Sequence, residues 1–159
     1  MRPLSPLPSH RRRGHLVAAV RDHVGLLSGL VAFAWILEIV DFLLFGRLDQ
    51  FGILPRTVAG IGGIVVAPVL HAGFGHLISN TIPFLVLGGV VLMGGRRVFI
   101  LASWFIILTG GTALWMFGPA GTVHIGASLL IFGYLGFLIA RGLFEKSVFW
   151  VVVGVVILI

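Results

Sequence analysis

Hydrophobic residues recur along this chain in long runs that are separated by short polar stretches. Crossing the hydrocarbon core of a bilayer takes about 20 apolar residues, with about 17 as the lower bound. Four runs approach or exceed that length, and they cover residues 26–45, 77–94, 98–117 and 125–140. A shorter run covers 147–159. Because only a helix satisfies its own backbone hydrogen bonds in lipid, the pattern predicts an all-α polytopic membrane protein with about five transmembrane helices, the last one incomplete.

Two segments outside these runs need a different interpretation. Residues 58–70 are apolar but short and rich in glycine, so we expect a loop that lies in or on the membrane. Residues 1–25 carry several arginines and three early prolines. Proline breaks helices and like charges repel, so we expect a basic cytoplasmic N-terminal arm that is disordered over residues 1–15. The remaining residues, 26–159, form the predicted transmembrane domain.

Composition excludes a soluble globular protein, because 58% of the residues are hydrophobic, 10% are charged and the mean hydropathy is +1.15. The net charge of +6 comes from arginines at the ends of the apolar runs. Charges in those places are typical of topology determinants and lipid headgroup contacts, not of nucleic-acid binding. The chain has no cysteine, which excludes disulfide and thiol chemistry within it.

The loop charges also predict how the chain is oriented. Arg96 and Arg97 lie between the second and third runs, and Arg141 and Lys146 follow the fourth. These residues fall on the same side of the membrane as the basic arm. The positive-inside rule makes that side cytoplasmic, so we expect an integral protein of a bacterial plasma membrane with a cytoplasmic N-terminus.

Polar side chains gather where the second run begins, at His71, His76 and Asn80. His76 and Asn80 are four residues apart and therefore share one face of a helix. Polar groups are costly at the edge of hydrocarbon, so such a cluster indicates a functional site. A second polar motif, Gly126-x-Ser128, opens the fourth run.

The two motifs are expected at a similar depth in the membrane. Asn80 lies 16 residues before Arg96, and Ser128 lies 13 residues before Arg141. At about 1.5 Å per residue, these intervals place them roughly 24 Å and 20 Å above the cytoplasmic boundary. Lateral proximity does not follow from depth alone.

The histidine–histidine–asparagine pattern, followed by Gly126-x-Ser128, resembles the rhomboid intramembrane serine proteases. The long loop that contains residues 51–56 is also similar to loops in that family. The resemblance implies a rhomboid-like helical bundle with a six-helix core. It implies that Ser128 is the nucleophile, that His76 and Asn80 help to form the oxyanion hole, and that the substrate is a transmembrane segment of another protein, cut near the outer face.

The chemistry of these residue types agrees with that implication. A serine hydroxyl is a poor nucleophile until a base takes its proton, and the resulting oxyanion needs preorganised donors. Asn80 offers an amide NH₂ group, His76 offers a ring N–H, and Ser128 lies near the positive end of a helix dipole. Gly126 permits close approach of backbone or substrate, and His71 is expected to support the site as a loop hydrogen-bond partner.

Two features depart from the family pattern. The family's general base is a histidine on the sixth helix, and no histidine follows His124 in this sequence. Leu129 follows the serine, where the family usually has glycine, and leucine would crowd packing against the sixth helix. We therefore expect a chain truncated before that helix, with weak or no proteolysis on its own.

Two other functions stay open at this point. Glu38 or Asp41 in the first run could join the histidines in a metal or proton site of a small transporter, although no His-Glu-x-x-His motif is present. The third possibility is a non-catalytic module that holds client helices. The protease interpretation implies no metal and no organic cofactor, and its partners are a transmembrane protein substrate and the lipid bilayer, not nucleic acid.

Overall fold

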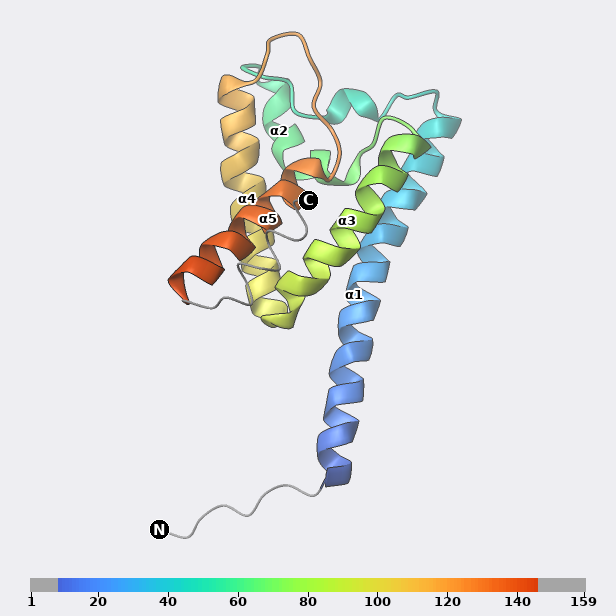
Figure 1. The fold of residues 1–159 in the computed structure, drawn as a ribbon. Helices are drawn as coiled ribbons and strands as arrows, with labels where there is room; N and C mark the ends of the chain where they lie inside the picture. Colours follow the sequence, from blue (N-terminus) through green and yellow to red (C-terminus); the bar gives the residue numbers. More distant parts are fainter. Residues whose placement is uncertain (1–8, 146–159) are drawn as a thin grey trace.

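The structure is a computed structural model, and it describes residues 9–145 as a bundle of helices (Figure 1). The helices are α1 (Ser9–Leu43), α2 (Ala59–Val66), α3 (Phe74–Met93), α4 (Arg96–Phe117) and α5 (Ser128–Phe144), with 3₁₀ turns η1 (Asp49–Phe51) and η2 (Ala67–Val69). The described residues contain no strand, only one isolated antiparallel bridge between Ile53 and His124. The predicted all-α fold is confirmed.

Three helices are long and apolar enough to cross a membrane, within Val20–Leu43, Phe74–Met93 and Arg96–Phe117. Helix α5 is apolar and has 17 residues, at the lower limit for a span. The four long runs predicted from the sequence fall, in order, on α1, α3, α4 and α5. The fifth predicted run, 147–159, lies outside the described residues.

Two local predictions were wrong. Helix α1 begins at Ser9, so residues 9–15 are helical and not disordered. No proline follows Pro8 in this stretch, and extending an existing helix by residues such as arginine, leucine and alanine costs little once it is nucleated. Residues 58–70 are not a loop, because they contain α2 and η2.

The helices pack in a fixed order across the bundle. Helix α3 contacts α1 on one side and α5 on the other, and α4 contacts α5 and α2. Helix α2 lies at the end of the bundle where α3 and α5 begin, and the N-terminal part of α1 extends beyond the other helices at the opposite end (Figure 1). We call the first of these ends the loop end.

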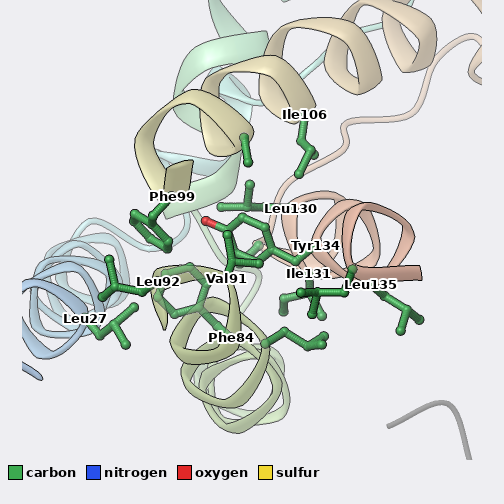
Figure 2. Packing of buried hydrophobic residues seen from close by; sticks show 14 residues of the cluster. Leu27, Phe84, Val91, Leu92, Phe99, Ile106, Leu130, Ile131, Tyr134 and Leu135 are labelled. Carbon is green, nitrogen blue, oxygen red and sulfur yellow. The ribbon is translucent and has the colours of Figure 1, made fainter. Parts of the chain in front are cut away.

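Tyr134 of α5 lies at the centre of the main hydrophobic cluster, close to Phe99 and Leu130 (Figure 2). Its ring is fully buried. Its hydroxyl is 2.6 Å from Ser103 Oγ of α4, and Ser103 Oγ itself donates to the Phe99 carbonyl oxygen at 2.6 Å. The one phenol in the core is therefore hydrogen-bonded, as buried polar groups generally are.

Candidate active site

Backbone hydrogen bonds on two sides position the segment that leads into α5. The Ile53 N–H donates to the His124 carbonyl oxygen, and the His124 N–H donates to the Ile53 carbonyl oxygen, both at 2.9 Å. Two residues later, the Gly126 N–H donates to the Ala67 carbonyl oxygen at 2.9 Å. The segment is thus attached both to the loop after α1 and to the start of η2, which leaves its backbone little freedom to shift.

Glycines allow three backbone layers to stack at the loop end. A Cβ atom at Gly52 would lie 2.7 Å from the His124 carbonyl oxygen, so this glycine lies flat against the segment before α5. On its other side, Gly63 of α2 lies directly against the Gly52 carbonyl group, and Gly60 lies against the backbone of Leu54. Side chains at these positions would push the layers apart, which explains why α2 has glycine at positions 60 and 63.

Arg56 attaches the same loop to the end of α4. Its Nη1 atom donates to the carbonyl oxygens of Met116 at 3.1 Å and Gly118 at 2.8 Å. In return, the Trp115 indole N–H donates to the Thr57 carbonyl oxygen at 2.8 Å. Arg56 adopts a left-handed backbone conformation, with φ of 59°. A guanidinium thus satisfies carbonyl groups that the last turn of a helix leaves without partners.

The two polar motifs meet at Gly126. A Cβ atom at this residue would lie 2.6 Å from Cε1 and 2.8 Å from Nε2 of His76, and 3.5 Å from Nδ2 of Asn80. Gly126 also has φ of +108°, a conformation that residues with a side chain rarely adopt. His76 and Asn80 lie one turn apart on α3, and the Asn80 amide donates to the His76 carbonyl oxygen at 3.1 Å. The second N–H of that amide is a further donor.

Ser128 is the first residue of α5, two residues after Gly126, and it is half-buried. Backbone N–H groups in the first turn of a helix have no partners within the helix, and the helix dipole favours negative charge there. The next side chain, Leu129, lies against α4, because a Cβ atom at Gly110 would be only 3.1 Å from Leu129 Cδ1. This accommodation of Leu129 was not predicted, although the pair Gly110-Gly111 in the sequence was a visible signal for it.

His71 is buried next to His76. The centroids of the two rings are 5.3 Å apart, with an angle of 68° between the ring planes. Both ring nitrogens of His71 are buried, next to the backbone of Val69, and the supporting role of His71 stays a prediction. Burial, and secondarily the proximity of His76, lower the pKa of His71 to about 4. The ring is therefore neutral at physiological pH.

The acidic residues near the end of α1 have local structural contacts. Glu38 and Asp41 are both buried. Asp41 Oδ1 accepts a hydrogen bond from the Leu48 N–H at 2.6 Å, which closes the turn after α1, and the Glu38 carboxylate interacts with the backbone of Gly73 at the start of α3. Burial, followed by the charge of Asp41, raises the pKa of Asp49. Within residues 9–145, no group of three or more His, Cys, Asp or Glu is arranged to hold a metal ion.

Comparison with known proteins identifies the family. The Rhomboid domain matches residues 58–159, well over half of the chain. "Uncharacterized protein Mb1372" from Mycobacterium bovis is 43% identical over 133 residues, which cover 80% of this chain and 55% of that protein. "Putative rhomboid protease YdcA" from Bacillus subtilis is 33% identical over 132 residues, which cover 76% of this chain and 66% of that protein. No solved structure matches the chain closely enough to count as similar.

The chain belongs to the rhomboid family. "Uncharacterized protein ML1171" from Mycobacterium leprae shows the same extent of similarity as the Mycobacterium bovis protein, with 40% identity over 133 residues, 80% of this chain and 53% of that protein. The chain thus spans about half the length of the mycobacterial relatives it matches. With its apolar helices, the family assignment makes this an integral membrane protein.

Proposed function

We propose that this chain carries the nucleophile and the oxyanion site of an intramembrane serine endopeptidase. Ser128 is the nucleophile, and His76 and Asn80 donate to the oxyanion, with Gly126 and His71 in supporting positions. The observation that supports these roles is the contact of Gly126 with both donor side chains. Because Ser128 follows Gly126 by two residues, its hydroxyl belongs to the same short segment that lies against the donors.

The substrate we propose is a transmembrane segment of another protein, cut near the membrane face at which α3 and α5 begin. Arg96, Arg97 and Arg141 lie at the opposite ends of the spanning helices. By the positive-inside rule that opposite side is cytoplasmic, as is the N-terminus. Since the relatives named above are bacterial, we place the protein in a bacterial plasma membrane with its candidate site toward the exterior.

The general base is the missing component within these residues. No histidine follows His124, and Nε2 of His124 already forms a hydrogen bond with Thr122 Oγ1 at 2.9 Å. We therefore expect weak or no peptide hydrolysis from the 159 residues alone. A second candidate function is a non-catalytic module that binds the transmembrane helices of client proteins, and Leu129, which follows Ser128 where the family usually has glycine, favours it.

A labelling experiment separates the two functions. The chain in proteoliposomes is treated with a fluorophosphonate probe, with and without imidazole as a diffusible base. We expect imidazole to promote labelling, Ser128→Ala to abolish it, and Ser28→Ala to leave it unchanged, because Ser28 lies exposed on α1. Asn80→Ala should slow labelling by about 10²–10³-fold, the usual effect of losing one oxyanion donor. Labelling that persists in Ser128→Ala, or that no imidazole concentration produces, overturns the protease proposal and favours the binding module.

A further inference from the structure

A cavity of about 320 Å³ lies inside the bundle and extends to Ala127, the residue before Ser128. Its interior wall includes the buried side chains of Phe84, Leu130 and Tyr134, from α3 and α5. Four other lining residues are substantially exposed, namely Leu30 of α1, Val65 of α2, and Ile100 and Trp104 of α4. In a membrane-spanning bundle these residues face lipid, so the cavity opens sideways between α1 and α4, beneath α2.

The cavity is elongated along the helices and closed at the loop end. Lining residues extend from Leu26 to Ala34 on α1 and from Phe99 to Ile107 on α4. Each of these stretches is about 12 Å long at 1.5 Å per residue. At the loop end, Val65 of α2 together with Pro68 and Val69 of η2 forms a roof. Helix α2 is too short to cross the membrane, so it leaves this lateral opening beneath it.

The hydroxyl groups in the wall are hydrogen-bonded within the protein. The Tyr134 hydroxyl and Ser103 Oγ satisfy each other. Thr81 Oγ1 donates to the Leu77 carbonyl oxygen at 2.8 Å. His71, at the roof, is neutral at physiological pH, as described above. No Asp, Glu, Lys or Arg lines the cavity.

We propose that this cavity binds one acyl chain of a bilayer phospholipid. Its mouth is continuous with the lipid-facing surface of α1 and α4, where hydrocarbon chains are the surrounding solvent. Most of the cavity wall is apolar, which favours hydrocarbon over water as its occupant. The volume is about twice that of the apolar cavity of about 150 Å³ that binds one benzene molecule, and the length suits an extended chain.

A transmembrane helix does not fit this space. Such a helix is about 10–12 Å across with its side chains, so a 12 Å length of it occupies several times the cavity volume. A single hydrocarbon chain that enters from the mouth reaches Asn80 and Ala127, which also line the cavity. The bound lipid therefore packs beneath the candidate oxyanion donor. This binding does not depend on the proposed protease function.

Photolabelling tests the proposal on the full chain. The protein is reconstituted with a phosphatidylglycerol that carries a diazirine near the end of one acyl chain, irradiated and mapped by mass spectrometry. We expect adducts at the buried residues Phe84 and Leu130, in addition to adducts at Phe105, which faces lipid outside the cavity. Ala34→Phe fills the cavity, so it should remove the interior adducts and keep those at Phe105. Ile36→Phe, an exposed position on α1 outside the cavity, should change neither.

A measurement on the unmodified sequence makes the test independent of how the variants fold. Unlabelled phosphatidylglycerol should compete for the interior adducts with saturation near one lipid per protein, while the adducts at Phe105 decline only in proportion to dilution of the probe. Three results would each overturn the proposal. The interior adducts could be absent, they could decline under competition only in proportion to dilution of the probe, or they could remain unchanged in a folded Ala34→Phe protein.

Discussion

Replacement of Gly126 by alanine tests the contact that joins the two polar motifs. The added methyl group would lie 2.6 Å from Cε1 of the His76 ring and 2.8 Å from Nε2. Favourable contacts between non-bonded heavy atoms are about 3.5–4.0 Å, so the methyl group is too close by about 1 Å. The φ of +108° adds backbone strain, since alanine rarely adopts this conformation.

The cost can be estimated from these two effects. Overpacking in a well-packed region costs about 1–3 kcal/mol, and a side chain held in a sparsely populated backbone region costs about 1–3 kcal/mol. The sum is roughly 2–6 kcal/mol if neither the ring nor the backbone yields. Rotation of His76 would lower the cost, but it would also remove the imidazole from its place beside Gly126. Stability or site geometry must therefore change.

The assay combines thermal unfolding in detergent with the imidazole-dependent labelling of Ser128. For Gly126→Ala we expect a melting temperature lower by at least about 4 °C, since 1 kcal/mol corresponds to about 2–4 °C in a protein of this size, together with slower labelling. Gly75→Ala is the matched control, because a Cβ atom at Gly75 would meet nothing within 4 Å. A Gly126→Ala protein that melts and labels like the parent would refute the described contact, as would equal effects in both variants.

Three further predictions concern the support of the site. Gly63→Ala should destabilise the protein, because its methyl group would collide with the Gly52 carbonyl group, whereas Gly62→Ala should not, since the space there is open; thermal unfolding of the two variants provides the comparison. Arg56→Ala should lower stability by about 1.5–3 kcal/mol, the usual worth of hydrogen bonds from a charged donor, and should accelerate amide exchange where the loop meets the end of α4. The pKa of His71 is lowered from 6.5 to about 4 in the folded protein. Between these two pH values the His71 side chain is protonated in the unfolded chain and neutral in the folded chain. Stability should therefore decrease by about 3 kcal/mol as the pH falls from 6.5 toward 4, and His71→Phe should show a weaker pH dependence in the same unfolding assay.

The sequence predicted the spanning helices because their signal is local. A single segment of about twenty apolar residues in lipid must form a helix, because only a helix satisfies its own backbone hydrogen bonds there. The predicted runs and the observed helices therefore agree to within a few residues, except at the start of α1. The short helix α2 was missed because its length fits no span, and its glycines suggested a loop. Gly60 and Gly63 are helical because they allow close backbone stacking, which is a tertiary effect that local propensity does not reveal.

The candidate site was predictable in part. Helical spacing placed His76 and Asn80 on one face, and the loop charges placed Ser128 at a similar depth. The contact of Gly126 with those two side chains depends on backbone pairing with Ile53 and Ala67. Those partners lie 71 and 59 residues earlier in the chain than His124 and Gly126 respectively, and no periodicity or charge pattern reports such pairing.

The double attachment of the segment before α5 also determines when the site can exist during synthesis. Ile53 and Ala67 emerge from the ribosome long before His124 and Gly126. The backbone groups of Ile53 and the carbonyl group of Ala67 therefore lack these hydrogen-bond partners until the later residues have been made. A growing polypeptide that has inserted only α1 through α4 holds His76 and Asn80 of α3 without Gly126, the residue that they contact in the finished fold. The two polar motifs therefore meet only after α5, the last described helix, has been made and has docked.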